Sequence, residues 1–330
     1  MMFPRPKIRL YQERTFGEKF SATFDFIKEN WRLWLKGSCY LLLPLSLVQS
    51  FTLNSFMGTW FSTIEGGPSD NEVVNFLVSY GGYILFTIIG IVLMTSFLYA
   101  MMQEYQQNAR RLENVTLTDL KPLMIKNVKR SLLVSLVLGI VTVVVFGILS
   151  FAAVSYESVW LFLLVVVGLM VSFVPMSLVL PTYIFETDNG LFYSISRGFG
   201  LGWSTWGGTA LLMLVMSFIV NFIQSIFATP WLVATIVKAV LVSESGDSSL
   251  VQSGIYSFMM YLLGVVQLFG TYVVSTLTVV SLAYQYGHAA EREDGMSVND
   301  DIANFESMAN NELGGFESTT NNDIANFESL

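Results

Sequence analysis

The stretch WLFLLVVVGLMVSFVPMSLVLP, from Trp160 to Pro181, decides the fold class of this protein. It contains 22 residues and no charged side chain. An apolar helix of about 20 residues is long enough to cross the hydrocarbon core of a bilayer. Because lipid offers no hydrogen-bond partners, a crossing segment must satisfy its backbone groups internally. The stretch therefore predicts a membrane-spanning helix.

Five other stretches have the same character, so the sequence predicts an all-α bundle of six transmembrane helices. The six predicted spans are residues 37–60, 80–102, 131–154, 159–183, 209–227 and 256–283. A seventh apolar stretch, WLVATIVKAVLV at residues 231–242, is too short to span and carries Lys238. We expect it to form a surface-lying or re-entrant helix.

Composition agrees with this class. The chain of 330 residues is 53% hydrophobic and 13% charged, whereas soluble domains are about a quarter charged. Its net charge of −8 is concentrated at the C-terminus, because residues 291–330 hold ten acidic side chains and one basic side chain. The acidity therefore belongs to a tail and gives no hint about a ligand of the main body.

Few residues suited to catalysis or metal binding are present. A single cysteine, Cys39, excludes an intramolecular disulfide and a cysteine-based metal cluster. His288 is the only histidine, and catalytic metal sites usually combine several histidine and carboxylate ligands. No ionisable residue lies in the central part of a predicted span, which argues against a proton-coupled transporter. We expect no enzyme activity, no cofactor, no metal and no nucleic-acid partner.

The basic residues predict the orientation, since Lys and Arg are retained on the cytoplasmic side. The segment before the first span holds eight of the 17 bases, and the loop between the second and third spans holds six. Arg197 and Arg292 fall on the same side, and only Lys238 falls on the other. Both termini are therefore predicted to be cytoplasmic. No cleavable signal peptide is predicted, because about 36 polar and amphipathic residues precede the first long apolar run.

The segment FGEKFSATFDFIKENWRLWLKG at residues 16–37 predicts an N-terminal interfacial amphipathic helix. Its predicted apolar face holds Phe16, Phe20, Phe24, Ile27, Trp31 and Trp34. Its predicted polar face holds Glu18, Lys19, Asp25, Lys28, Glu29 and Arg32. Similar segments precede the third and fifth spans. Either three helix–hairpin units form an internal repeat, or these are ordinary amphipathic linkers of a polytopic protein.

Two of these regions carry a family resemblance. RTFGEKFSATFDFIKENWRLWLKGSCYLLLPL resembles the start of a group of six-span bacterial proteins, which includes the membrane domain attached to some glycerophosphodiester phosphodiesterases. LVLPTYIFETDNGLFYSISRGFGLGWSTWGGTALLMLV is similar to that group's pattern of a span ending in proline, an acidic residue, and a short helix with Ser-Arg. Here these residues are Pro181, Glu186, Ser196 and Arg197.

The resemblance covers most of residues 15–285 and implies the fold and a bacterial cytoplasmic (inner) membrane location. It does not imply an activity. Catalysis in that family belongs to a separate soluble domain that uses histidines and metal-binding carboxylates. A chain with one histidine departs from that pattern, so enzyme function is not carried over.

Amide side chains are the main polar groups within the predicted spans. One interpretation is that they hydrogen-bond between helices, each contributing about 1 kcal/mol. The other is that four of them line a polar cavity for a lipid headgroup or a small solute. These four are Asn54, Asn221, Gln224 and Gln267.

The segment GFGLG at residues 198–202 has two interpretations. Glycine-rich loops can hold phosphate, but no strand precedes this one and no P-loop lysine follows it, so we expect close helix packing. Beside it, Arg197, Trp203 and Trp206 form a candidate lipid-headgroup site. Snorkelling of these side chains at the interface explains them equally well.

The last 31 residues, DDIANFESMANNELGGFESTTNNDIANFESL, repeat one motif three times, with phenylalanines every 11 residues. So polar a segment buries too little surface to order itself, which predicts a disordered tail. An 11-residue period corresponds to three helical turns, so the phenylalanines would share one face of a helix induced by a partner. The candidate partner-binding residues are Ile302, Phe305, Leu313, Phe316, Ile324, Phe327 and Leu330.

The repeats suit a multivalent docking motif, although a neutral duplication would look the same. We expect three regions: an amphipathic N-terminal segment (1–36), a transmembrane domain (37–290) and an acidic cytoplasmic tail (291–330). The predicted function is a non-catalytic membrane accessory or scaffold protein whose tail docks a partner protein. The alternative is a transporter or lipid-handling protein with a polar cavity between helices.

Overall fold

The computed structural model describes residues 6–66, 70–245 and 253–295. Within these ranges the chain forms nine helices and no strand. They are α1 (Phe16–Glu29), α2 (Trp31–Gly66), α3 (Asp70–Gln107), α4 (Leu117–Ser155), α5 (Val159–Met176), α6 (Val179–Phe185), α7 (Leu191–Ser204), α8 (Trp206–Ser245) and α9 (Gly254–Asp294).

Six segments are long and apolar enough to cross a bilayer, which confirms the predicted all-α, six-span architecture. These segments lie in α2, α3, α4, α5 with α6, α8 and α9. The protein is thus a multi-pass membrane protein. The predicted disordered tail lies outside the described residues.

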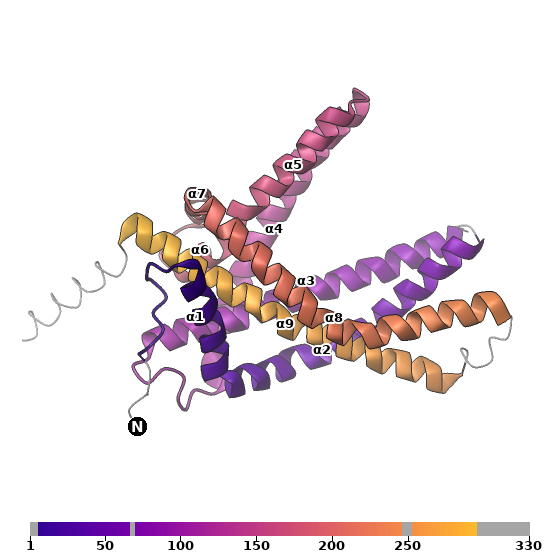
Figure 1. Cartoon of the computed structure of the whole chain (residues 1–330), viewed down its shortest axis with the longest axis horizontal. Coiled ribbons are helices and arrows are strands. Elements are labelled where there is room, and N and C mark those ends of the chain that lie inside the picture. The colour runs from indigo at the N-terminus through magenta and orange to yellow at the C-terminus, as the bar shows by residue number, and fades with distance from the viewer. Residues whose placement is uncertain (1–5, 67–69, 246–252, 296–330) are drawn as a thin grey trace, which may run out of the picture.

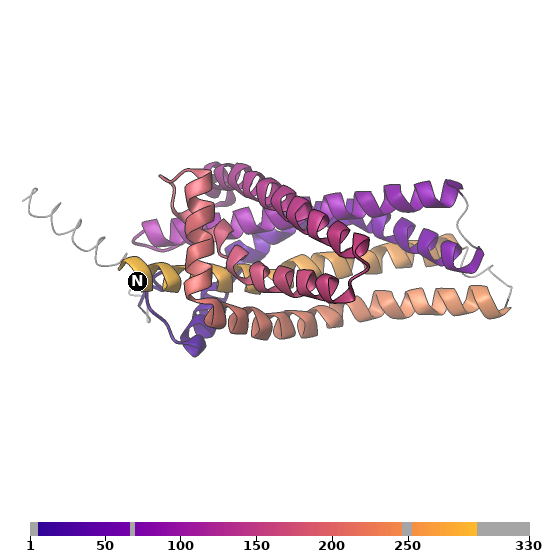
Figure 2. The same ribbon diagram turned by 90° about the horizontal axis from the view of Figure 1, so that it is seen from above.

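The helices form a bundle from which one hairpin diverges. α2, α3, α8 and α9 run along a common direction, while the α4–α5 hairpin points away from them (Figures 1 and 2). One end of the bundle holds residues 6–36, the loop 108–116, α6, α7 and the last turns of α9, and we call it the basic end. The opposite end, where α2 meets α3 and α8 meets α9, is called the far end.

The long helices exceed the thickness of a bilayer. α9 has 41 residues and α4 has 39, so at a rise of 1.5 Å per residue each is roughly 60 Å long. The hydrocarbon core is only about 30 Å thick. Much of each helix therefore stands in the headgroup region or in water, which leaves room for a polar assembly at the basic end.

α9 is the central helix of the bundle. Tyr272, Val280, Tyr284 and Tyr286 on this helix are all buried. The Tyr272 hydroxyl donates a hydrogen bond of 2.7 Å to Oε1 of Gln49 on α2, as the interhelical interpretation of the amides predicts. Because lipid is as apolar as leucine, association within the bilayer depends on such hydrogen bonds and on van der Waals packing.

Residues 231–242 do not form a separate surface or re-entrant helix, so that prediction is wrong. They continue α8 without a break beyond Pro230. Proline is tolerated in a membrane helix when neighbouring groups support the backbone. Here Trp231 Nε1 donates to Asn54 Oδ1 at 3.2 Å, and the Tyr256 hydroxyl donates to the Ala234 carbonyl at 2.5 Å.

The N-terminal helix α1 exists, but the face that it buries differs from the predicted one. Lys19, Ala22, Thr23 and Phe26 are buried, although Lys19 was assigned to the polar face. Part of the predicted aromatic face is exposed (Phe16 and Phe24). The reason is that α1 packs against α9 through a stripe next to the aromatic one. Its position in the membrane interface stays a prediction.

The glycines of GFGLG serve close helix packing, as expected. A Cβ atom at Gly202 would lie 2.4 Å from the Pro175 Cα, and one at Gly198 would lie 2.6 Å from the Val179 Cα. Gly200, between them in α7, has open space at the same position. α7 therefore contacts the backbone at the α5–α6 break through two glycines spaced one turn apart.

We expect Gly202→Ala to destabilise the protein by about 1–3 kcal/mol, because the clash is with backbone that cannot rotate away. The matched control Gly200→Ala should be neutral or stabilising, since alanine favours helix over glycine by about 1 kcal/mol. Thermal unfolding in one detergent measures both. Equal melting temperatures for the two variants would contradict the proposed contact.

Candidate functional site

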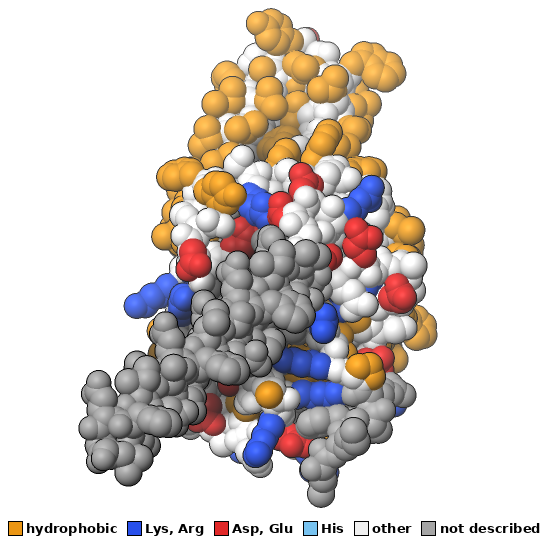
Figure 3. All heavy atoms as spheres, turned by 90° about the vertical axis from the view of Figure 1, so that its left-hand side faces the viewer, with side chains coloured by type: hydrophobic (Ala, Val, Ile, Leu, Met, Phe, Trp, Pro, Cys, Tyr) orange, Lys and Arg blue, Asp and Glu red, His pale blue; other side chains and the backbone are white. Residues whose placement is uncertain are grey.

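Charged side chains gather at the basic end. Viewed from that end, blue and red side chains of both signs cover the described surface, and the diverging hairpin behind them is largely hydrophobic (Figure 3). The arrangement agrees with the sequence, where all bases except Lys238 fall on the predicted cytoplasmic side. The polar groups of this end are therefore the first candidates for a functional site.

An ion-pair cluster joins α6, α7 and α9. Arg197 of α7 donates from Nε to Glu186 Oε1 at 2.7 Å, and its Nη2 contacts Asp294 Oδ2 in the last turn of α9. The Tyr286 hydroxyl donates to the same Glu186 oxygen at 3.0 Å. The Glu186 side chain is only 7% exposed, and burial of a carboxylate is tolerated when it is paired and hydrogen-bonded.

The candidate lipid-headgroup site, Arg197 with Trp203 and Trp206, does not form. Two carboxylates already engage Arg197. Trp203 stacks on Phe199 with ring centroids 6.2 Å apart and is 57% exposed. Trp206 Nε1 donates to the Val171 carbonyl at 3.1 Å. The three side chains have separate partners and do not converge on one position.

We expect Arg197→Gln to lower the free energy of unfolding by about 2–3 kcal/mol, because it leaves the Glu186 carboxylate buried without its cation. Combining it with Glu186→Gln should restore part of that loss, since the buried charge is then gone. Denaturation midpoints test both, with the exposed Arg110→Gln as control. A double variant that is as unstable as the sum of the single variants would contradict this pairing.

An extended N-terminal strap, residues 6–15, ties α3 to α9. Lys7 Nζ donates to the Gln106 carbonyl at 2.6 Å, and Gln106 Nε2 donates back to the Ile8 carbonyl at 2.8 Å. At the other end, Arg14 N donates to His288 Nδ1 at 3.0 Å. These contacts hold the segment before α1 across the ends of two spanning helices.

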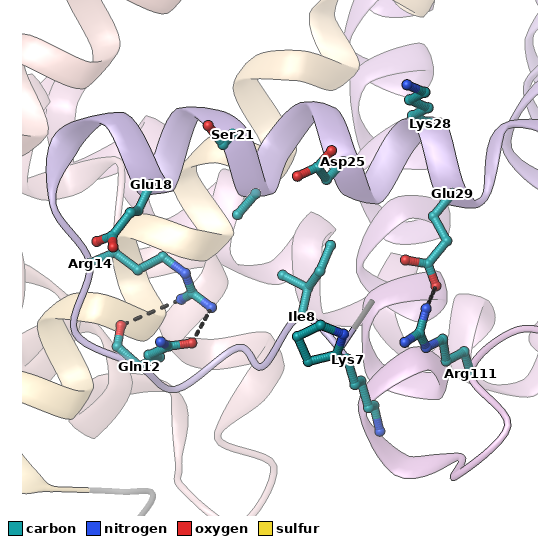
Figure 4. A pocket seen from close by; sticks show the side chains of 12 residues that line it. Lys7, Ile8, Gln12, Arg14, Glu18, Ser21, Asp25, Lys28, Glu29 and Arg111 are labelled. Atoms are coloured by element: carbon teal, nitrogen blue, oxygen red, sulfur yellow. Dashed lines mark hydrogen bonds and ion pairs between the residues drawn. The ribbon is translucent and has the colours of Figure 1, made fainter. Parts of the chain in front are cut away.

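A cavity of about 700 Å³ opens between the strap and α1. In Figure 4, Glu29 extends from α1 toward Arg111, and Arg14 folds back along the strap. The Glu29–Arg111 ion pair measures 2.7 Å. Arg111 has a left-handed backbone (φ 57°) in the loop after α3, so the ion pair accompanies a strained conformation. The lining carries side chains of both signs of charge, among them Lys7, Asp25 and Lys28.

A buried polar core behind α1 was not predicted from the sequence. Lys19 Nζ donates to Gln285 Oε1 at 2.8 Å, and Gln285 Nε2 donates to Thr209 Oγ1 at 2.8 Å. Burial, with Arg14 and Arg292 nearby, lowers the pKa of Lys19 to about 8. The ammonium thus has the Gln285 amide oxygen as its partner, the Thr209 hydroxyl accepts from the same amide, and two arginines lie nearby. The sequence did contain a sign that Lys19 is buried. Lys19 lies three residues before Ala22 and seven before Phe26, at helical spacing on the stripe that α1 buries.

This environment makes stability depend on pH. Below about pH 8 Lys19 is charged in both states and the folded protein bears the desolvation cost. Between pH 8 and the ordinary lysine pKa of 10.5 only the unfolded chain binds the proton, so stability rises with pH. We expect the melting temperature of the wild type to rise from pH 8 to pH 10 relative to Lys19→Met. Parallel curves for the two proteins would contradict this.

The four amides proposed to line a cavity do not meet. Asn54 bonds to Trp231, which lies ten residues beyond Asn221 along α8, or roughly 15 Å. Asn221 is exposed and donates to the Ser217 carbonyl of its own helix. Gln224 donates to Thr271 at 3.0 Å between α8 and α9. Gln267 Oε1 is buried and has no hydrogen-bond partner among the described residues.

Asn54 alone of the four lines one of the described cavities, at the far end beside Lys238. Sequence reasoning assigned Lys238 to the side opposite the other bases but did not consider it as a ligand-binding residue. The sequence feature that could have identified Lys238 is that it is the one charged residue in an apolar stretch. The tail residues from Ile302 to Leu330 lie outside the described part of the chain.

Comparison with known proteins adds no relative. No family model, curated protein or solved structure matches this chain.

Proposed function

We propose that this protein is a non-catalytic membrane accessory or scaffold protein whose C-terminal repeats dock a partner protein. The observation that carries the proposal is the anchoring of α9. Its last turn is tied to α7 through Asp294 and Arg197, and Gly295 caps it in a left-handed conformation (φ 58°), with its N–H donating to the Glu291 carbonyl at 2.9 Å. The last described residue before the repeats, Gly295, is therefore held at a fixed point on the basic end.

A fixed starting point matters for a repeated motif. Linked copies bind a multivalent partner with higher avidity because the second contact is intramolecular, with an effective concentration that the linker sets. The repeats occur within a 31-residue segment, so only a short linker separates one copy from the next. The mixed-charge cavity at the basic end provides an adjacent surface for the same partner.

The proposal includes a location. The positive-inside rule supports a cytoplasmic location for the basic end and for the tail that follows it in the sequence. The resemblance to six-span bacterial proteins favours a bacterial cytoplasmic membrane and supplies no activity. The partner would then be a cytoplasmic protein or the cytoplasmic part of another membrane complex.

A second candidate function is lipid handling. The cavity at the far end, which Asn54 and Lys238 help to line, favours it. The cavity lies between spanning helices, as that function requires. This function would not use the cavity predicted from four amides, because those amides do not meet.

The docking proposal is tested by co-purification in mild detergent with mass spectrometry, followed by binding measurements with the purified partner. We expect a partner to be retained by the full chain and lost from a chain ending at Gly295. The triple variant Phe305→Ala, Phe316→Ala, Phe327→Ala should bind at least tenfold more weakly, and each single variant only a few-fold more weakly, because avidity compensates for one lost copy.

The matched control changes three residues between the motifs, Met308, Thr319 and Thr320, to alanine. It should bind like the wild type. If the full and truncated chains retain the same proteins, or if the control loses binding as the triple phenylalanine variant does, the docking proposal fails.

A further inference from the structure

The far end of the bundle holds a cavity of about 350 Å³ between α2, α8 and α9. This volume lies at the small end of the range for ligand sites, about 300–1,000 Å³. Phe51, Met57 and Met260 contribute apolar side chains to the lining. The polar lining residues are Asn54, Ser55, Thr235, Lys238, Tyr256 and Ser257.

The floor of this cavity is held by hydrogen bonds between all three helices. Trp231 of α8 donates to Asn54 of α2. Ser50 of α2 donates to the Tyr261 carbonyl of α9 at 2.8 Å, and the Tyr261 hydroxyl donates back to the Leu47 carbonyl at 2.9 Å. A Cβ atom at Gly264 would lie 2.5 Å from Ser50 Oγ, so α2 and α9 are in close contact here. The cavity is therefore a preformed feature of the bundle.

Lys238 is the unusual group in the lining. It is the one base of the chain that falls on the side opposite the other 16. Within the described ranges no hydrogen bond or ion pair engages its ammonium. A lysine at a membrane surface can simply extend toward water along its apolar stem, but that role needs no preformed cavity lined by both apolar and polar side chains.

We propose that this cavity binds an amphiphile with one apolar chain and an anionic head group, a carboxylate or a phosphate. The Lys238 ammonium pairs with the head group, and the Ser257 hydroxyl supplies a hydrogen bond. The Thr235 and Tyr256 hydroxyls already donate to the Trp231 and Ala234 carbonyls and help to shape the cavity. Charge-assisted hydrogen bonds of this kind are about twice as strong as neutral ones. The apolar chain lies against Phe51, Met57 and Met260, and the small volume favours one chain over two.

This inference goes beyond the docking function and does not depend on it, since the tail begins at the opposite end of α9. It gives the lipid-handling alternative a specific site and ligand chemistry. Two sources of the ligand share that chemistry: a phospholipid of the bilayer that inserts one chain, and a free fatty acid.

The test measures equilibrium binding of labelled oleate and of lysophosphatidic acid to the full chain in phosphatidylcholine nanodiscs. We expect saturable binding that Lys238→Gln weakens about tenfold and Lys238→Arg largely retains. Gly58→Leu should weaken it as well, because Gly58 lines the cavity and has open space at its Cβ position. The control Lys129→Gln removes an exposed lysine of α4 and should leave binding unchanged.

Melting temperatures verify that each variant folds. Lysophosphatidylcholine, whose head group has no net charge, should bind much more weakly than lysophosphatidic acid. Lipid extraction from purified wild type and Lys238→Gln distinguishes the sources, since the natural ligand should be depleted in the variant whether it is a phospholipid or a fatty acid. Equal binding by wild type, Lys238→Gln and Gly58→Leu overturns the proposal, and so does equal binding of both lysolipids.

Discussion

The buried carboxylate of Glu186 is the point on which the basic end depends. Arg197 and Tyr286 both donate to it, and Arg197 also reaches Asp294. Arg130 of α4 donates to the backbone on either side of it, at the Tyr183 and Thr187 carbonyls, 2.7 Å in each case. α4, α6, α7 and α9 thus meet around one acid. Burial of apolar surface does not drive helices together in lipid. This polar centre therefore helps to join the diverging α4–α5 hairpin (Figure 1) to α7 and α9.

The sequence predicts the architecture well because one physical rule controls it. An uncharged stretch such as residues 160–181 has no option in lipid except a helix, so all six spans were found. Prediction was wrong where tertiary contacts decide. The short length of residues 231–242 and the charge of Lys238 predicted a separate helix, but Trp231 and Tyr256 support a continuous α8 through that region. Likewise Lys19 looked exposed by helical periodicity, and a polar core formed by Gln285 and Thr209 receives it instead.

The candidate sites were less predictable than the spans, since a binding site depends on which residues of different helices meet. Asn54, Asn221, Gln224 and Gln267 share a chemistry, but local partners such as Ser217 and Thr271 satisfy two of them. The cavity that does form combines Asn54 with Lys238 and Tyr256, residues far apart in the sequence. The two ends of the bundle are therefore distinct: hydrogen bonds and ion pairs fix the basic end, and the far end holds a cavity with a lysine.

The central claim is that the last turns of α9 are fixed to the basic end, so that the tail begins at a defined position. Hydrogen–deuterium exchange of the full chain in nanodiscs tests it most directly. The account predicts slow exchange of backbone amides through residues 284–294, comparable to the middle of α9, because Asp294 and Tyr286 are held by Arg197 and Glu186. Exchange within seconds in this segment, as in an unanchored helix end, would contradict the account.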